Sequence, residues 1–337
     1  MDRRQLFAMM KAYHRTSLLR AAVDLDVFTH LADGPAAPGE VAVRVGADAR
    51  GTRILLNALA AVRLAETDGT RFWLTEAHAD LLVPGRPGYA AGMVHVFAGD
   101  REWEAHRRIA EAVRHGGSVL AENAETAGYA FWEDFARHAD VVAEPTAELL
   151  ADTLKPWATD RAELDVLDVA CGHGIYGYTA AKRYPQARVW SLDWANVLDE
   201  AHKHAVRLGV ADRVERIAGD MFDTPLGGPY DLVLVTNVLH HFSAERAAEL
   251  LARAASVLKP DGRLGIVGFT TSGRTPAQDP APYLFDLLML AWTAQGEVHS
   301  EQTYERLLAE AGLRIIANEP VDRPGIDFHV LLAGRAA

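Results

Sequence analysis

The sequence has a single cysteine, Cys171, among 337 residues. An intramolecular disulfide is therefore excluded, and a reducing compartment such as the cytoplasm is expected. Long apolar runs are also missing. The longest, Tyr283 to Ala294, is shorter than the roughly 18 residues of a membrane span and contains Asp286. No apolar segment follows the basic start of the chain, so we expect neither a signal peptide nor membrane association.

Positive charge is scarce as well. Lys and Arg total 34 against 46 Asp and Glu, which gives a net charge of −12. Such a chain has no general attraction for a phosphate backbone, which argues against nucleic acid as a partner. Apolar residues make up 49% and charged residues 24%, a globular composition. At roughly 100–200 residues per domain, the length suggests two domains.

Helical patterns fill the first hundred residues. Apolar residues recur at helical spacing from Met9 to Leu31, and a short helix is expected over Pro38 to Val45. Asp48 is a suitable N-cap for a further helix through Leu64. Glu66 to Thr75 indicates two short strands around an Asp-Gly turn. This order of helices and hairpin predicts a mostly α-helical, winged-helix-like domain.

Winged helices often bind DNA, and this alternative has to be weighed. The helix that would read DNA carries only Arg50, Arg53 and Arg63, whereas DNA-reading helices usually show a denser basic face. We therefore interpret the module as a packing or dimerisation domain and expect no nucleic acid partner.

Residues 100–157 have the pattern of two or three helices. Trp103, Phe131, Trp132 and Phe135 are candidates for the wall of a cleft, although plain helix packing explains each of them equally well. The pattern changes near residue 160. We expect a winged-helix-like domain over 1–100, connecting helices over 101–160 and a ligand-binding domain over 161–337.

Strands and helices alternate in the second half of the chain. This alternation predicts an α/β fold, a Rossmann-like and mainly parallel sheet with helices on both faces. Ligands bind such sheets at the carboxyl ends of the strands. The expected strands are Asp165–Ala170, Arg188–Leu192, Val214–Ala218, Tyr230–Thr236 and Arg263–Phe269.

Two glycines, Gly172 and Gly174, follow the first of these strands and precede a helix. Glycine lets the backbone approach a ligand closely, and the helix N-terminus favours a carboxylate or a phosphate. Gly177 completes a G-x-G-x-x-G spacing, so this turn alone does not separate the chain from a dinucleotide-binding dehydrogenase.

Other strand ends carry polar residues too. Asp168 lies on the first strand, and Asp193 ends the next one about 20 residues later, where a carboxylate can bind two ribose hydroxyls. Asp220 follows the third strand and can accept a hydrogen bond from an adenine amino group, while Met221 and Phe222 pack on the ring. The fourth strand leads into Asn237-Val238-Leu239-His240-His241-Phe242.

The motifs LDVACGHG, SLDWANVL, AGDMF and NVLHHF resemble those of class I S-adenosylmethionine-dependent methyltransferases. More narrowly, the chain resembles small-molecule O-methyltransferases with an N-terminal dimerisation domain, over nearly its whole length. The resemblance implies S-adenosylmethionine as cofactor, S-adenosylhomocysteine as product, and Cys171 as a small apolar residue of the cofactor loop. The implied cofactor residues are Asp168, Ala170, Gly172, Gly174, Asp193, Trp194, Gly219, Asp220, Met221, Phe222 and Asn237.

The resemblance also implies a catalytic base. A phenol with a pKa of about 10 is only about 0.1% ionised at pH 7. Removing the phenol's proton within the site is therefore worth up to about 4 kcal/mol. The family's catalytic histidine follows the fourth strand in an L-H-[DH]-[WF] pattern, which residues 239–242 fit. We therefore expect His240 to act as the base and His241 to cap the next helix or contact the substrate.

Two positions depart from the family pattern. Relatives orient the catalytic histidine with an acidic residue after the fifth strand, where this chain has Gly268. A second acidic residue belongs to a later G-K-E-R-T stretch, which here reads Gly296-Glu297-Val298-His299-Ser300. Either Glu297 or His299 is expected to take its place in catalysis.

Three alternatives stay open. The residues His240, His241, His299 and Glu297 could hold zinc or iron, but no close H-x-x-x-H spacing supports a metal site, and we predict none. The same scaffold could methylate carbon or nitrogen, with or without such a metal. It could also belong to a relative that retains the cofactor and does not methylate.

Phe285, Met289 and Trp292 recur on one face of a helix expected over 281–293, a stripe that plain core packing also explains. In the family this helix lines the acceptor cavity. The resemblance therefore implies that Met289 and Trp292 contact the substrate together with His241 and, from the helical segment, Phe131 and Trp132. This lining suggests a small aromatic or polyketide-like acceptor.

Apolar side chains also stand out near the N-terminus. Phe7, Met10 and Tyr13 need a partner to cover them. The N-terminal helices of relatives interlock between two subunits, so we expect a homodimer formed through these helices.

Overall fold

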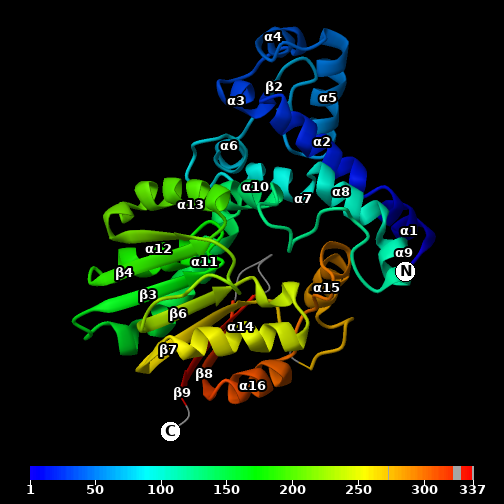
Figure 1. Cartoon of the computed structure of the whole chain (residues 1–337). Coiled ribbons are helices and arrows are strands. Elements are labelled where there is room, and N and C mark those ends of the chain that lie inside the picture. Colours follow the sequence, from blue (N-terminus) through cyan, green and yellow to red (C-terminus); the bar gives the residue numbers. More distant parts are fainter. Residues whose placement is uncertain (272, 322–327, 336–337) are drawn as a thin grey trace. The chain divides into compact units, whose positions relative to one another are not determined.

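The computed structural model describes residues 1–271, 273–321 and 328–335 (Figure 1). The chain forms two compact units, Met1–Trp103 and Glu104–Ala337. The finer division into three segments at residues 100 and 160 stays a prediction. None of the helices in the described part of the chain combines the length and the apolar character of a membrane span.

The first unit consists of short helices and one small hairpin. The segment expected as one helix over 9–31 is interrupted twice, at Lys11 and Ala12 and again near Asp26, which adopts a left-handed conformation with φ 52°. Asp48 caps the fifth helix as expected, accepting a hydrogen bond of 2.8 Å from the Gly51 N–H. The elements are α1 (Arg3–Met10), α2 (Tyr13–Asp24), α3 (Val27–Ala32), α4 (Pro38–Arg44), α5 (Ala49–Ala61), β1 (Glu66–Thr67), β2 (Phe72–Trp73), α6 (Glu76–Leu82), η1 (Ala91–Met93) and α7 (Val94–Phe97).

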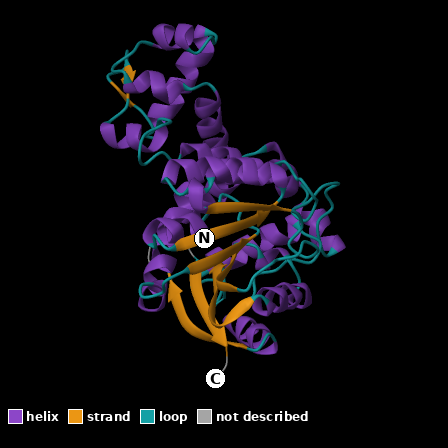
Figure 2. Ribbon diagram, turned by 60° about the vertical axis from the view of Figure 1, so that its left-hand side comes forward, coloured by secondary structure: helices purple, strands orange, loops and turns teal. Residues whose placement is uncertain are grey.

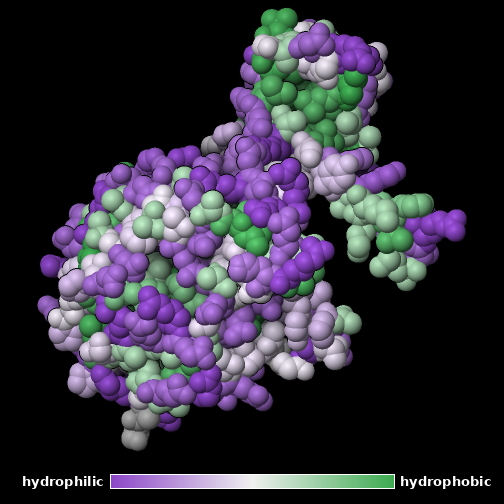
Figure 3. Space-filling view, turned by 45° about the vertical axis from the view of Figure 1, so that its right-hand side comes forward, coloured by the Kyte–Doolittle hydropathy of each residue, from purple (hydrophilic) through white to green (hydrophobic). Residues whose placement is uncertain are grey.

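The core of the first unit leaves α1 uncovered. Side chains from α3, α5 and β2, among them Phe28, Leu56 and Phe72, are fully buried together. No residue of α1 is buried, whereas Phe7 is 53% and Met10 59% exposed. Figure 3 shows hydrophobic side chains at the surface of this unit. Such exposure of large apolar side chains indicates a surface that another chain covers.

The second unit contains four helices where two or three were expected before residue 160. They are α8 (Asp100–Arg107, which begins in the first unit), α9 (Ile109–His115), α10 (Phe131–His138) and α11 (Asp140–Ala158). The remaining elements are β3 (Leu164–Val169), α12 (Ile175–Arg183), β4 (Ala187–Asp193), α13 (Ala195–Leu208), η2 (Ala211–Arg213), β5 (Val214–Ala218), β6 (Tyr230–Thr236), η3 (Leu239–His241), α14 (Ala244–Ser256), β7 (Leu258–Gly268), α15 (Pro280–Trp292), α16 (Glu301–Glu310), β8 (Leu313–Pro320) and β9 (His329–Arg335).

These strands form one sheet with the order β5-β4-β3-β6-β7-β9-β8, seven strands within the described residues. The pairs from β5 to β7 are parallel, and β9 and β8 add an antiparallel edge that the sequence had not led us to expect. Helices cover both faces of the sheet (Figure 2). The expected Rossmann-like, mainly parallel architecture is therefore confirmed.

The two faces carry separate cores because alternate residues of a strand point to opposite sides. On β6, Leu232 and Leu234 pack with α11, α12 and α13, whereas Val233 and Val235 pack with α14 and α16. Figure 1 shows α12 and α13 on one side of the sheet and α14 and α16 on the other. A sheet buried on both faces fixes the position of every strand end, and the polar residues of the site follow those ends.

At the amino end of β6, the buried carboxylate of Asp231 forms ion pairs with two basic side chains. Asp231, which is 2% exposed, accepts hydrogen bonds of 2.7 Å from both Arg161 and Lys259 and one of 2.8 Å from the Asp165 N–H. Burial acts to raise the pKa of Asp231, but these three donors outweigh it and lower the pKa. This cluster lies at the opposite end of β6 from the candidate site.

Candidate active site

The turn after β3 holds an unusual run of left-handed backbone conformations. Ala170 has φ 52°, Gly172 φ 55° and Gly174 φ 73°. A side chain at Gly174 would overlap the ring of Tyr178, so this position needs glycine both for its conformation and for its space. Ala170 is strained, because a non-glycine residue rarely adopts this left-handed conformation. Such strain is concentrated at ligand sites.

A second strained residue stands at the end of the neighbouring strand β6. Asn237 has φ 52°, and its Nδ2 donates a hydrogen bond of 2.9 Å to the hydroxyl of Tyr176. Its Oδ1 is buried and accepts no hydrogen bond within the described structure. A buried acceptor of this kind costs free energy unless a ligand supplies a donor.

Asp168 provides another buried acceptor without a donor. The residue is fully buried, and its Oδ2 accepts a hydrogen bond of 3.2 Å from the Gly177 N–H. Its Oδ1 has no partner among the described residues. Burial raises its pKa to about 8, the Gly177 hydrogen bond opposes this shift, and nearby Asp193 adds to it. The carboxylate would be stabilised by a cationic or hydrogen-bond-donating ligand.

Asp193 joins two strand ends. Its Oδ2 accepts from the Gly172 N–H at 2.8 Å, and its Oδ1 accepts from the Trp194 N–H at 2.7 Å. Burial raises the pKa of Asp193 to about 6 in spite of these two bonds. Each carboxylate oxygen retains a further lone pair, so two vicinal hydroxyls can still donate to it. Asp220, after β5, accepts from the Phe222 N–H at 2.7 Å and so fixes the following turn.

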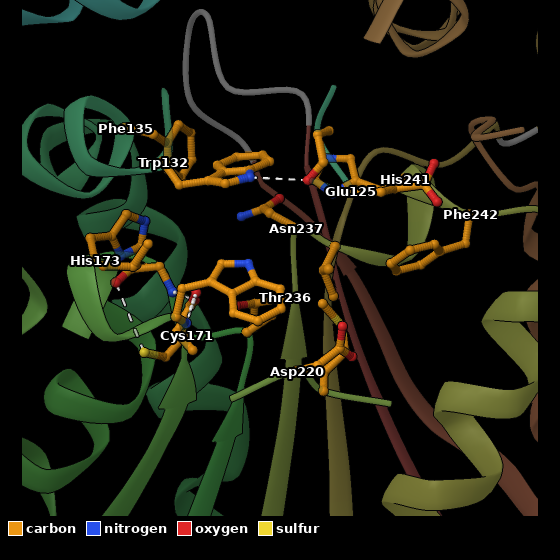
Figure 4. A pocket seen from close by; sticks show the side chains of 18 of the residues that line it. Glu125, Trp132, Phe135, Cys171, His173, Asp220, Thr236, Asn237, His241 and Phe242 are labelled. Carbon is orange, nitrogen blue, oxygen red and sulfur yellow. Dashed lines mark hydrogen bonds between the residues drawn. The ribbon is translucent and has the colours of Figure 1, made fainter. Parts of the chain in front are cut away.

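These strand ends surround one cavity, and Figure 4 shows its lining. Of the residues expected at the cofactor, Ala170, Gly172, Asp193, Trp194, Asp220, Met221, Phe222 and Asn237 line it, and of those expected at the substrate, Trp132 and His241 do. Asp168, Gly174 and Gly219 do not line it. Cys171, expected in the cofactor loop, and Phe135, expected in the wall of a cleft, line it as well. The sequence analysis did not assign the remaining lining residues, which are Ala124, Glu125, His173, Tyr176, Val197, Thr236, Val238, Phe242 and Arg246.

Cys171 lies in the lining but is buried, and burial together with the charges of Asp193 and Asp168 raises its thiol pKa well above the usual value. It is therefore an unreactive apolar contact, as expected. Arg246 reaches the cavity from α14 and lies over the ring of Phe222, 3.5 Å from its centroid. Arg246 lies on α14, beyond the NVLHHF motif, so only the fold shows that its cation reaches the cavity.

The two histidines after β6 face different surroundings. His241 lines the cavity, and its ring lies 5.2 Å from that of Trp132. His240 lies behind it, with its ring edge-on to His241 at 4.7 Å and to Phe285 at 4.8 Å. Burial, His241 and His299 together lower the pKa of His240 well below its ordinary value, and burial lowers the pKa of His241 to about 4. Both rings are therefore neutral at pH 7.

Glu297 and His299 lie near each other, and only His299 is also a neighbour of His240. His299 is buried, and its Nε2 donates to the Leu239 carbonyl at 3.2 Å. Glu297 is exposed, with Oε1 3.9 Å from His299 Nδ1. Among the described residues no carboxylate hydrogen-bonds to His240, and no group of three His, Cys, Asp or Glu is arranged to hold a metal ion.

Aromatic side chains from α10 and α15 meet beside the cavity. Phe131 lies edge-on to Trp292 at 4.4 Å and to Trp132 at 5.2 Å. Trp132 Nε1 donates to the Ala124 carbonyl at 3.1 Å (Figure 4). Met289 is buried on the same helix as Trp292. The residues expected to contact the substrate thus come together, packed on one another in this structure.

Comparison with known proteins agrees with this geometry. Residues 7–85 match the family model of the O-methyltransferase dimerisation domain, and residues 152–314 match that of the O-methyltransferase domain. The chain belongs to the O-methyltransferase family.

Similar proteins span its whole length. The tetracenomycin polyketide synthesis 8-O-methyltransferase of Streptomyces glaucescens is 28% identical over 329 residues, 95% of this chain and 94% of the relative. A putative O-methyltransferase structure from Nostoc punctiforme is 27% identical, with a TM-score of 0.87 over 99% of both chains. Human N-acetylserotonin methyltransferase in complex with S-adenosylmethionine is 25% identical, with a TM-score of 0.84 over 100% of this chain and 99% of that one.

The residues of this methyltransferase fit S-adenosylmethionine, the cofactor of its family. Two buried acceptors, Asp168 Oδ1 and Asn237 Oδ1, have no donor in the described structure, and the cofactor carries an ammonium group and hydroxyls. Asp193 stands at the strand end where a ribose binds. Met221 and Phe222 offer apolar surface for a base. A cationic nucleoside carries the donors that these acceptors lack.

Proposed function

We propose that this enzyme transfers a methyl group to a hydroxyl oxygen of a small aromatic or polyketide-like acceptor. The observation that carries the proposal is that the polar cofactor cavity adjoins a cluster of aromatic side chains. Polar strand ends form the cofactor cavity, and Trp132 of its lining contacts both His241 and the aromatic rings of Phe131 and Trp292. A flat aromatic acceptor would bind by replacing some of these ring contacts. The relative from Streptomyces glaucescens, named for an O-methylation in polyketide synthesis, supports this acceptor class.

The cofactor supplies a methyl carbon that is already activated by its positive sulfur. The protein has to hold the acceptor oxygen in line with that carbon and let its proton leave. Asp193 would bind the ribose, Asp220 the base, and Asp168 and Asn237 the donors of the amino acid part. Trp132, His241, Met289 and Trp292 would orient the ring of the acceptor.

We further propose that His240 receives the proton of acceptors that bind in the protonated form. Its lowered pKa leaves the ring neutral at pH 7, so that it can accept a proton. The Leu239-His240-His241-Phe242 stretch also resembles the pattern around the family's catalytic histidine. Glu297 Oε1 lies 3.9 Å from His299 Nδ1, and His299 Nε2 donates a hydrogen bond to the carbonyl of Leu239, the residue before His240. They would therefore act as positioning residues for η3 rather than as the base.

Calorimetric titration with S-adenosylmethionine, S-adenosylhomocysteine and a nicotinamide dinucleotide tests the cofactor. Binding of the first two alone is expected. Methyl transfer is then followed with isotope-labelled cofactor on phenols and aromatic amines, and the labelled position is located by NMR. Label on nitrogen or carbon would replace the O-methylation proposal, and cofactor binding without transfer to any class would indicate a non-methylating relative.

We also propose a homodimer formed through α1. The family's dimerisation model covers residues 7–85, and Phe7 and Met10 are more than half exposed. The double variant Phe7→Asp/Met10→Asp should be monomeric in sedimentation at micromolar concentration, where the wild type is dimeric. Val43→Asp, a change at an 83% exposed position of α4, is the control that should remain dimeric. A dimer that survives the double variant would place the interface elsewhere.

A further inference from the structure

Among the residues that the structure describes around His240, none would stabilise a proton on it. Its neighbours are His241 on the same turn, Phe285 of α15, His299 of the segment before α16, and Gly268 at the end of β7. A Cβ built on Gly268 would lie 3.6 Å from His240 Nδ1, an ordinary contact distance. A Cβ therefore fits at this point, where the chain has glycine.

The carboxylates nearest to this group act elsewhere. Glu297 faces His299, and Asp286 accepts a hydrogen bond of 2.7 Å from the Val298 N–H. Burial lowers the pKa of His299, while Glu297 and Asp286 work to raise it. Neither carboxylate acts on His240. Glu125 also lines the cavity. Its side chain is exposed and accepts a hydrogen bond of 3.0 Å from the Ala294 N–H.

A buried imidazole between two other imidazoles and a phenylalanine is a weak base. Its pKa lies well below 6.5, whereas that of an ordinary phenol is about 10. Moving a proton from such a phenol to His240 is therefore unfavourable by more than about 10³-fold. A hydroxyl that loses its proton more readily avoids this barrier.

We propose that the acceptor is a phenol or enol conjugated with a carbonyl group, so that its hydroxyl binds as an oxyanion or passes its proton to a weak base. The inference rests on the proposed O-methylation. The oxyanion's electron pair forms the new O–CH₃ bond, the methyl–sulfur bond breaks, and its electron pair stays on sulfur as the neutral thioether. The proton has gone to solvent before binding or goes to His240. Absence of a carboxylate at Gly268 also spares such an anion a like charge.

Three acceptors with the same ring size separate the possibilities: 2-hydroxy-1,4-naphthoquinone, whose hydroxyl is acidic, 1-naphthol, whose hydroxyl is not, and 1-naphthylamine. At pH 7 we expect kcat/KM for the hydroxyquinone to exceed that for 1-naphthol by at least about 10-fold, with the ratio falling as pH rises and 1-naphthol ionises. His240→Gln should slow 1-naphthol by about 10²–10⁴ and the hydroxyquinone far less. Equal rates on both hydroxyls at pH 7 would overturn the inference, whereas methylation of the amine alone would overturn the proposed function.

The variant Gly268→Asp supplies the missing carboxylate, and Gly268→Ala is its matched control with the same Cβ. We expect Gly268→Asp to raise the rate on 1-naphthol at least about 10-fold and to leave or lower that on the hydroxyquinone. Gly268→Ala should change neither preference.

An acceptor-independent measurement accompanies these rates. NMR titration of labelled histidines in the complex with S-adenosylhomocysteine, with the His240 signal assigned by its loss in His240→Gln, should show a neutral His240 down to pH 6. Protonation of wild-type His240 at or above pH 7 would refute the inference whichever acceptors react. Gly268→Asp should move its titration upward.

Discussion

Asp168→Asn should make the ligand-free enzyme more stable at neutral pH and at the same time weaken its cofactor binding. The carboxyl is fully buried with one oxygen unpartnered, and burial raises its pKa from 3.8 to about 8. An acid whose pKa is raised in the folded state binds its proton more tightly there than in the unfolded chain. Stability is therefore lost as pH rises from about 4 to about 8 and is constant above.

The size of the effect follows from this window. Each pH unit between the two pKa values costs about 1.4 kcal/mol, so about 4 kcal/mol has accumulated by pH 7. Asparagine cannot ionise, and its Oδ1 can still accept from the Gly177 N–H. The variant should thus match the wild type near pH 4 and exceed it by up to about 4 kcal/mol at pH 7.

Urea unfolding of both ligand-free proteins between pH 4.5 and 8.5, followed by tryptophan fluorescence, measures this difference. Calorimetry should show the variant binding S-adenosylmethionine at least about 10-fold more weakly, because a charged acceptor is worth roughly 1.5–3 kcal/mol. Parallel stability curves for the two proteins, or unchanged cofactor affinity, would refute the argument that Asp168 is kept charged by the ligand at the expense of stability.

Three further variants test separate parts of the structure. Gly174→Ala should destabilise the protein by more than Gly209→Ala, since both positions have positive φ but only the first adds an overlap with Tyr178; thermal unfolding compares them. Asp231→Asn should cost about 3–5 kcal/mol at pH 7 and less at acid pH, where the lowered pKa of the wild-type carboxyl ceases to contribute, yet leave cofactor affinity unchanged in calorimetry. Asn237→Ala should weaken cofactor binding at least about 5-fold, and an unaltered affinity would remove its Oδ1 from the site.

The cofactor half of the site was accessible from sequence because the strands that carry it are buried on both faces. Most residues of β3 and β6 are apolar and buried, and the turns of the site follow directly after both strands. Parallel order then brings Asp193, Asp220 and Asn237 to one edge. The edge strand β8 was missed because its exposed residues outnumber its buried ones, so that its pattern resembles a loop.

Other residues of the lining depend on backbone conformations that sequence does not reveal. Positive φ at Ala170 and Asn237 redirects the chain just after each strand. Alanine avoids that region, so the residue type at position 170 gives no sign of this turn, whereas asparagine is one of the few non-glycine residues that adopt it. His173, Tyr176 and Thr236 lie next to these turns and line the cavity, although the sequence analysis had assigned them no role there.

The acceptor side differs because its partners come from distant parts of the chain. The motif locates His240, but its surroundings are set by Gly268, Phe285 and His299, which only the fold brings together. Carboxylates lie within β3, at the end of β4 and just after β5, whereas His240 and His241 follow β6 and Gly268 ends β7. The sheet edge thus passes from negative to neutral. A cationic cofactor is stabilised at the first end, and an anionic acceptor would meet the cofactor's charge without meeting a carboxylate at the second. A neutral phenol would need the opposite arrangement, with a carboxylate behind the histidine, and a single substitution at Gly268 distinguishes the two.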